Sequence, residues 1–185
     1  MRNDRNFFLG LIISLSFMIS LPFWVKSEFF FFAAYSVLQF VILASAWNIL
    51  GGYAGYVNFG SAAFFAIGAY STIVGYKLQF PQGINIVFGT FVAAVVGLGM
   101  GYVTLRLRGV YFSIATLAMS VVLFTIVTNW SFVGGARGVY VIVPRESPIG
   151  IGQYIHWLYF LILGMATISV VVSRFIENSS LGQGL

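Results

Sequence analysis

Long runs of apolar residues, separated by short stretches that carry the charges, dominate this chain. The first run covers residues 7–25, and the longest covers residues 29–76 without a charged side chain. A helix needs about 20 apolar residues to cross a hydrocarbon layer of roughly 30 Å, so the longest run holds two crossings and each of the others holds one. The pattern therefore predicts about six transmembrane helices, near residues 7–25, 29–50, 61–76, 85–105, 111–130 and 155–173.

The continuity of these runs favours helices over membrane strands. Residues 37–44 and 120–127 are apolar at nearly every position, whereas the strands of a membrane barrel alternate apolar and polar residues. Helices also satisfy their backbone N–H and C=O groups within one segment. We expect an all-α integral membrane protein with one transmembrane domain over residues 1–185. The first run could instead be a signal peptide, but no small-x-small cleavage site follows it. We therefore expect the first helix to remain part of the protein.

Composition supports this class and excludes several others. The chain is 60% hydrophobic and only 7% charged, whereas soluble domains are about 25% charged. It has no cysteine and a single histidine, His156, which excludes thiol catalysis and cysteine-ligated zinc. Its positive charges are scattered rather than gathered in a stripe, which argues against nucleic-acid binding. We therefore expect no catalytic residue, metal site or cofactor on this chain, and a lipid bilayer as its surroundings.

The positive residues predict an orientation with the N-terminus inside. In that orientation Arg106 and Arg108 lie in a short cytoplasmic loop, and residues 131–154 form an outer loop. The sides of the later loops depend on whether the chain completes its crossing near residues 51–60, and the sequence leaves this open.

The segment from Gly51 to Gly60 is the most unusual part of the chain. It holds four glycines in ten residues and no charge, and each glycine costs about 1 kcal/mol relative to alanine within a helix. Ser61 follows as a candidate N-cap, and the helix after it reaches only about 24 Å. Glycine-interrupted helices mark the translocation sites of transporters, because non-helical backbone inside a membrane must be buried in protein or line water. The alternative is a flexible cytoplasmic turn whose glycines serve helix packing.

This interpretation selects three glycines, three polar residues and one phenylalanine around the break as candidates for a substrate pathway. They are Asn48, Gly51, Gly52, Gly55, Asn58, Phe59 and Ser61.

A second glycine cluster opens the predicted outer loop. Two prolines, Pro144 and Pro148, make the later part of this loop extended rather than helical. One interpretation is a structured surface that contacts a partner protein, and the alternative is an ordinary solvated loop. The candidates for partner contact are Gly134, Gly135, Arg137 and Arg145.

The chain shows no evident energy source of its own. No Asp or Glu lies inside a predicted span, and no phosphate-binding loop is present. If ATP drives the protein, a partner must hydrolyse it.

The four phenylalanines Phe29 to Phe32 are expected to face lipid.

Three motifs in order resemble those of the branched-chain amino acid ABC importer permeases, of the LivM-like type. They are AWNILGGYAGYVNFG with AAFFAIGAY at residues 46–60 and 62–70, LRLRGVYFSIATLA at 105–118, and GGARG at 134–138. The resemblance covers about residues 40–140.

The resemblance implies a permease subunit of an ATP-driven importer of branched-chain or other small amino acids in the prokaryotic cytoplasmic (inner) membrane. It is not an enzyme itself, because ATP and Mg²⁺ bind to the partner ATPases. The implied partners are a second homologous permease, two ATPase subunits and an extracytoplasmic solute-binding protein. The family continues past the position of Leu185 with a segment that docks the ATPase, so we expect that the C-terminal part is missing here.

Two other functions remain open at this point. One is a stand-alone secondary carrier or channel for a small neutral solute such as urea or an amide. The other is a truncated membrane subunit that does not transport.

Overall fold

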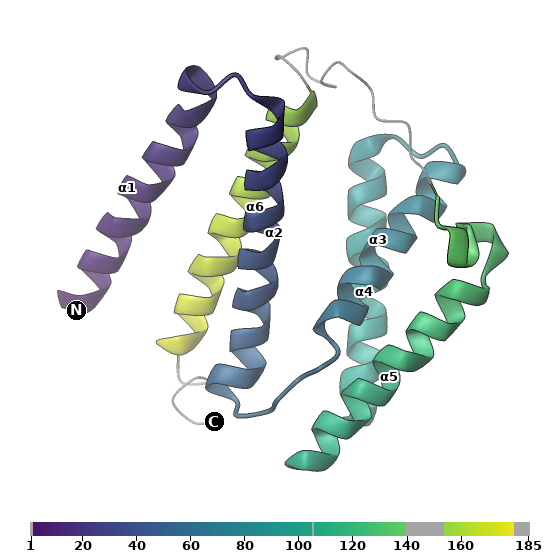
Figure 1. Cartoon of the computed structure of the whole chain (residues 1–185). Helices are drawn as coiled ribbons and strands as arrows, with labels where there is room; N and C mark the ends of the chain where they lie inside the picture. The colour runs from purple at the N-terminus through teal and green to yellow at the C-terminus, as the bar shows by residue number, and fades with distance from the viewer. Residues whose placement is uncertain (1, 105, 140–153, 180–185) are drawn as a thin grey trace. The chain divides into compact units, whose positions relative to one another are not determined.

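The described parts of the chain are mainly helical (Figure 1). The computed structural model describes residues 2–104, 106–139 and 154–179, and contains no strand within them. The long helices are α1 (Arg2–Trp24), α2 (Glu28–Asn48), α3 (Ser61–Lys77), α4 (Gln82–Thr104), α5 (Val110–Asn129) and α6 (Tyr154–Glu177). The short elements are a π-helical turn, η1 (Ile49–Tyr53), and two 3₁₀ turns, η2 (Ser131–Val133) and η3 (Gly135–Arg137).

The expected all-α membrane fold is confirmed. Within the described ranges, five helices are long and apolar enough to cross a membrane, and α3 is not among them. Its 17 residues reach about 26 Å, which is less than the roughly 30 Å of a hydrocarbon core. Of the six predicted crossings, the one at residues 61–76 is therefore the short one.

The helices form two compact units. One unit contains α1, most of α2 and most of α6, and the other contains the last residues of α2 together with η1, α3, α4 and α5. The single transmembrane domain predicted for residues 1–185 thus consists of two parts, each with its own packing.

In the first unit, α2 and α6 pack through aromatic and aliphatic side chains. Phe31 is fully buried, and its ring centroid lies 5.3 Å from that of Tyr159 and 4.6 Å from that of His156. The expectation that Phe29 to Phe32 all face lipid is wrong at Phe31, whereas Phe29 is 80% exposed. The reason is geometric: consecutive residues on a helix point about 100° apart, so four in a row cannot share one face.

A proline explains how α1 is attached to α6. Pro22 lies inside α1 and has no N–H to donate to the carbonyl of Met18, four residues earlier. The hydroxyl of Tyr159 donates to this carbonyl oxygen at 2.9 Å. A bond between helices thus replaces the bond that the proline removes from its own helix.

The second unit is built on a close pair of helices, α3 and α4. Residues 78–81 turn the chain so that α4 packs back against α3. The Asn85 amide donates to the Thr72 carbonyl oxygen at 2.8 Å. Helix α5 contacts both helices of the pair. These three helices and the segment that precedes α3 surround the candidate site.

Candidate functional site

The predicted break in the chain is present, and it starts with a widened turn. Residues 49–53 form one π-helical turn, and residues 54–60 are not helical. The Tyr56 N–H donates to the Leu50 carbonyl oxygen at 3.0 Å, which ties the residues after the turn back to it. The helical path therefore continues slightly further than the predicted break at Gly51. Single π turns occur frequently at functional sites.

Trp47 explains why a glycine occupies position 51. Its indole lies over the π turn, and its Nε1–H donates to the Asn58 carbonyl oxygen at 2.9 Å. A Cβ on Gly51 would lie only 2.8 Å from the indole ring. The missing side chain therefore gives the indole the room that it needs to reach Asn58.

The non-helical segment lies along α5, and hydroxyl groups of that helix satisfy its backbone. Ser113 donates to the Val57 carbonyl oxygen at 2.9 Å, and Ser120 donates to the Phe59 carbonyl oxygen at 3.1 Å. Between them, Thr116 Oγ1 accepts the Phe59 N–H at 3.2 Å. The three positions have spacings of three and four residues, so they share one face of α5. Three backbone groups of the segment are thus paired with protein, which is one way to satisfy non-helical backbone in a membrane.

Asn58 links this segment to the start of α3. Its Oδ1 accepts the Gly60 N–H at 2.7 Å, and the Asn58 side chain is buried. Gly60 is the N-cap of α3, and Ser61 is the first helical residue rather than the predicted cap. A Cβ on Gly60 would lie 3.0 Å from Asn58 Oδ1, so glycine leaves room for the amide to turn back.

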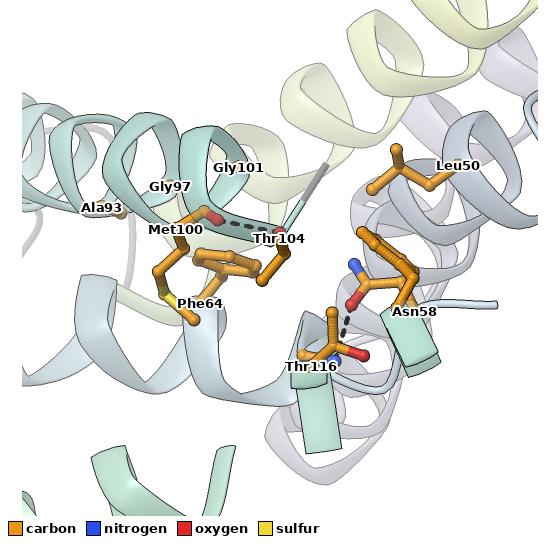
Figure 2. Close-up of a pocket in the computed structure, with 11 residues that line it drawn as sticks. Leu50, Asn58, Phe64, Ala93, Gly97, Met100, Gly101, Thr104 and Thr116 are labelled. Atoms are coloured by element: carbon orange, nitrogen blue, oxygen red, sulfur yellow. Dashed lines mark hydrogen bonds between the residues drawn. The ribbon is translucent and has the colours of Figure 1, made fainter. Parts of the chain in front are cut away.

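A pocket of about 320 Å³ lies between the break and helices α3, α4 and α5 (Figure 2). Its lining is mostly apolar, with two aromatic rings and a row of small residues. The lining residues are Leu50, Asn58, Gly60, Phe64, Ala93, Gly97, Met100, Gly101, Thr104, Phe112 and Thr116.

Of the seven pathway candidates, Asn58 is the one that lines this pocket. Asn48 ends α2, and Gly51 and Gly52 belong to the π turn. Gly55 adopts a left-handed conformation with φ of +70°. Phe59 is 54% exposed, and Ser61 is half-buried at the start of α3. The role of these other six residues in a pathway stays a prediction.

Sequence reasoning missed the contribution of α4 and α5. Ala93, Gly97 and Gly101 recur every four residues and present one face of α4 to the pocket. This spacing was visible in the sequence and indicates a face that a neighbour or a solute approaches closely. The hydroxyl series of α5 carried a similar signal, because Ser113, Thr116 and Ser120 share a helix face.

The candidate loop residues lie outside the pocket lining. Arg106 and Arg108 are exposed between α4 and α5, and the Arg106 guanidinium donates to the Tyr102 hydroxyl at 2.6 Å. Gly134 and Gly135 have positive φ values of 87° and 54° in the turns after α5, and Arg137 there is exposed.

Lys77, at the end of α3, reaches these turns and donates to the Phe132 carbonyl oxygen. Arg145 lies outside the described residues, as does most of the predicted loop at residues 131–154. Partner contact by these residues stays a prediction.

The pocket offers apolar surface and a few neutral polar groups. No charged side chain belongs to its described lining. The described parts of the chain hold no group of three or more His, Cys, Asp or Glu that could bind a metal ion. A small, largely apolar solute with a hydrogen-bonding group fits such a lining.

The sequence is similar to known transport proteins. The profile of the family described as "Branched-chain amino acid transport system / permease component" matches residues 29–184. The high-affinity branched-chain amino acid transport system permease protein LivM of Escherichia coli (strain K12) is 30% identical over 147 residues, which are 77% of this chain and 34% of that protein. LivM of Salmonella typhimurium (strain LT2) is 28% identical over 145 residues, with the same shares.

The chain spans about a third of the length of these two relatives. No solved structure matches it.

Proposed function

Because this chain belongs to the permease family of branched-chain amino acid transport systems, we propose that it is a membrane subunit of an ATP-driven importer. The transported solutes are branched-chain or other small amino acids. The chain is a multi-pass inner-membrane protein. What is proposed is the solute that it transports and the energy source of that transport.

The observation that carries this proposal is the pocket beside the helix break. The break and the helices α3, α4 and α5 all fall within the part of the chain that matches the family. One wall of the pocket is formed by the non-helical segment, through Asn58 and Gly60, rather than by a helix. A mostly apolar lining suits a solute with an aliphatic side chain, because burying apolar surface is favourable.

The energy source and the partners belong to the same proposal. No cofactor acts on this chain, and ATP with Mg²⁺ binds to two partner ATPase subunits. A second homologous permease completes the membrane pathway, and an extracytoplasmic binding protein delivers the solute. The support for these partners is the family itself, whose description names a permease component of a transport system.

Deletion of the gene in its native cell tests the function. We expect the deletion to abolish ATP-dependent uptake of radiolabelled leucine, and the restored full-length gene to recover it. Uptake that persists after ATP depletion, and that still requires the gene, would instead identify a carrier or channel that works alone. Unchanged uptake in the deletion strain would contradict a transport role for leucine.

A straightened break tests the route through the chain. The variant replaces four glycines by alanine together, at Gly51, Gly52, Gly55 and Gly60. Three of the new Cβ atoms would be too close to a neighbour: the one at Gly52 would clash with Asn48 Oδ1, and the others would lie 2.8 Å from the Trp47 indole and 3.0 Å from Asn58 Oδ1. We expect these contacts to distort the break by roughly 1.4 kcal/mol or more, and uptake to fall at least about tenfold.

A matched control carries the same number of glycine-to-alanine changes where a Cβ meets open space. These positions are Gly10, Gly83, Gly99 and Gly164. Both variants should insert into the membrane at the wild-type level, and only the first should lose uptake. Normal uptake by the straightened variant would remove the break from the pathway.

A further inference from the structure

The pocket contains one buried amide side chain, Asn58, whose nitrogen donates to no other residue in the described parts of the chain. Asn58 is 5% exposed, and its Oδ1 accepts the Gly60 N–H. Because Oδ1 already serves as an acceptor, the orientation of the amide is determined: Nδ2 is the other terminal atom. Among the described residues, none accepts a hydrogen bond from this nitrogen. Figure 2 shows Nδ2 turned away from the bond to Gly60, toward the side of the pocket where Phe64 and Thr104 lie.

The other polar side chains of the lining are already used as donors. The Thr104 hydroxyl donates to the Met100 carbonyl oxygen at 2.8 Å, and the Thr116 hydroxyl donates to the Ser113 carbonyl oxygen at 3.0 Å. Asn58 Nδ2 is therefore the side-chain donor that the described lining leaves available. Because this nitrogen is open to the pocket and belongs to a side chain that is otherwise buried, it is suited to a ligand acceptor.

We propose, building on the function proposed above, that Asn58 Nδ2 binds an oxygen atom of the solute, and that the pocket takes a carboxylate or carbonyl oxygen carried on a short aliphatic group. The oxygen accepts the amide hydrogens, and the aliphatic group lies against Phe64, Met100 and Phe112. The described lining residues include no cation, so the oxygen is recognised by a neutral donor. The ammonium group of an amino acid finds no anionic partner in this lining and must be held elsewhere.

The chain itself offers a clean assay, because it has no cysteine. In a Gly97→Cys variant the new thiol lies in the pocket wall, where a Cβ would meet Phe64 at an ordinary 3.7 Å. We measure its rate of reaction with methyl methanethiosulfonate in membranes, without ATP or partner proteins, and then with added solutes. The solutes are leucine, with a carboxylate; methyl isobutyl ketone, with a neutral carbonyl and no donor; and isoamylamine, with no oxygen.

We expect the ketone, or leucine, or both to slow the reaction, and isoamylamine to leave it unchanged. Protection by leucine alone would identify the carboxylate as the bound group. Protection by the ketone would show that the pocket also binds a neutral carbonyl oxygen. Two substitutions in the Gly97→Cys background, Asn58→Asp and Asn58→Ser, keep an oxygen acceptor for the Gly60 N–H but remove Nδ2. Asn58→Ser should raise the half-protecting concentration roughly fivefold, the effect of one neutral hydrogen bond. Asn58→Asp should raise the value for leucine further, because its carboxylate repels that of leucine.

Asn129 provides the matched control. It is exposed at the end of α5, and its amide donates to the Thr125 carbonyl oxygen at 2.8 Å, away from the pocket. Asn129→Asp and Asn129→Ser should leave protection unchanged. The thiol should react at the same rate without solute in all variants, which shows that the pocket still forms. If an Asn58 variant reacts at a different rate, the proposal is judged from the three solutes on the Gly97→Cys variant that keeps Asn58.

The inference is overturned if isoamylamine protects as well as the ketone, if the folded Asn58 variants keep full protection, or if no solute protects a reactive thiol. These outcomes are separate from those of the uptake experiment. Protection could hold in a protein that does not import leucine, and import could proceed without a bond to Asn58.

Discussion

The indole of Trp47 reaches from the last turn of α2 across the π turn to the carbonyl oxygen of Asn58. This contact joins the two ends of the break, and Gly51 beneath the ring gives it room. This contact explains why a tryptophan and a glycine occupy positions 47 and 51. The glycine permits the close approach, and the tryptophan makes the hydrogen bond. Neither function could be assigned from composition alone, which had suggested only that the helix was loosened here.

Replacing Trp47 by phenylalanine tests this contact. The indole is replaced by a smaller aromatic ring and the Nε1–H is lost, so we expect the free energy of unfolding in mixed micelles to fall by at least about 1 kcal/mol, the net value of one hydrogen bond. Trp24→Phe is the control, because that side chain is 85% exposed in α1. An equal loss in both variants would show that the bond to Asn58 does not stabilise the break.

At the scale of elements, α5 takes the place of the hydrogen-bonding partner that the unwound segment lacks. Its hydroxyls pair with backbone groups of Val57 and Phe59, groups that a helix would have satisfied internally. The face of α5 that looks polar in sequence is thus directed at protein backbone. The break and α5 depend on one another, although more than fifty residues separate Phe59 from Thr116 in the chain.

A Thr116→Val substitution tests this dependence with little change of shape. The Phe59 N–H loses its acceptor, and hydrogen bonds of this kind contribute about 0.6 kcal/mol in membrane proteins, so amide exchange over residues 54–60 should become about threefold faster. Hydrogen–deuterium exchange with mass spectrometry measures this change.

Thr125→Val is the matched control on the same helix. Its hydroxyl donates to the Val121 carbonyl oxygen of α5 itself, so exchange over residues 54–60 should stay at the wild-type rate. If both substitutions accelerate exchange equally, the side chains of α5 act only on their own helix.

The whole molecule is an inner-membrane protein of two compact units. The site lies in the second unit, and the first is held by its own aromatic core and by the bond from Tyr159 to Met18. Because Pro22 leaves the Met18 carbonyl without its helical donor, this bond compensates for a local defect in α1.

A double-mutant cycle tests the attachment of α1. Tyr159→Phe should destabilise the protein by about 1 kcal/mol, because the Met18 carbonyl loses its remaining donor. Adding Pro22→Ala restores a helical N–H, so the tyrosine substitution should cost much less in that background. The measurement is the free energy of unfolding, with Tyr111→Phe as control, since Tyr111 is 73% exposed. Equal costs in the two backgrounds would show that Pro22 and Tyr159 are not coupled.

The amino-acid sequence by itself determined the class of the protein, the approximate position of each helix and the place where the chain unwinds. These properties depend on local composition. Lipid accepts an apolar helix of sufficient length wherever it occurs, and glycines weaken a helix at their own positions. The motifs likewise indicated the family, because they are contiguous stretches of sequence.

Only the tertiary structure decided which residues face the pocket and what satisfies the break. Asn58 was a candidate among seven, and the role proposed for it depends on the direction of one amide, which the Gly60 N–H sets. Phe64, Met100 and Phe112 line the pocket because three helices meet there. The sequence alone does not distinguish an apolar residue that faces lipid from one that packs against a neighbouring helix. Hydropathy reports how favourable burial is, but the partner against which a side chain is buried follows from packing between distant segments.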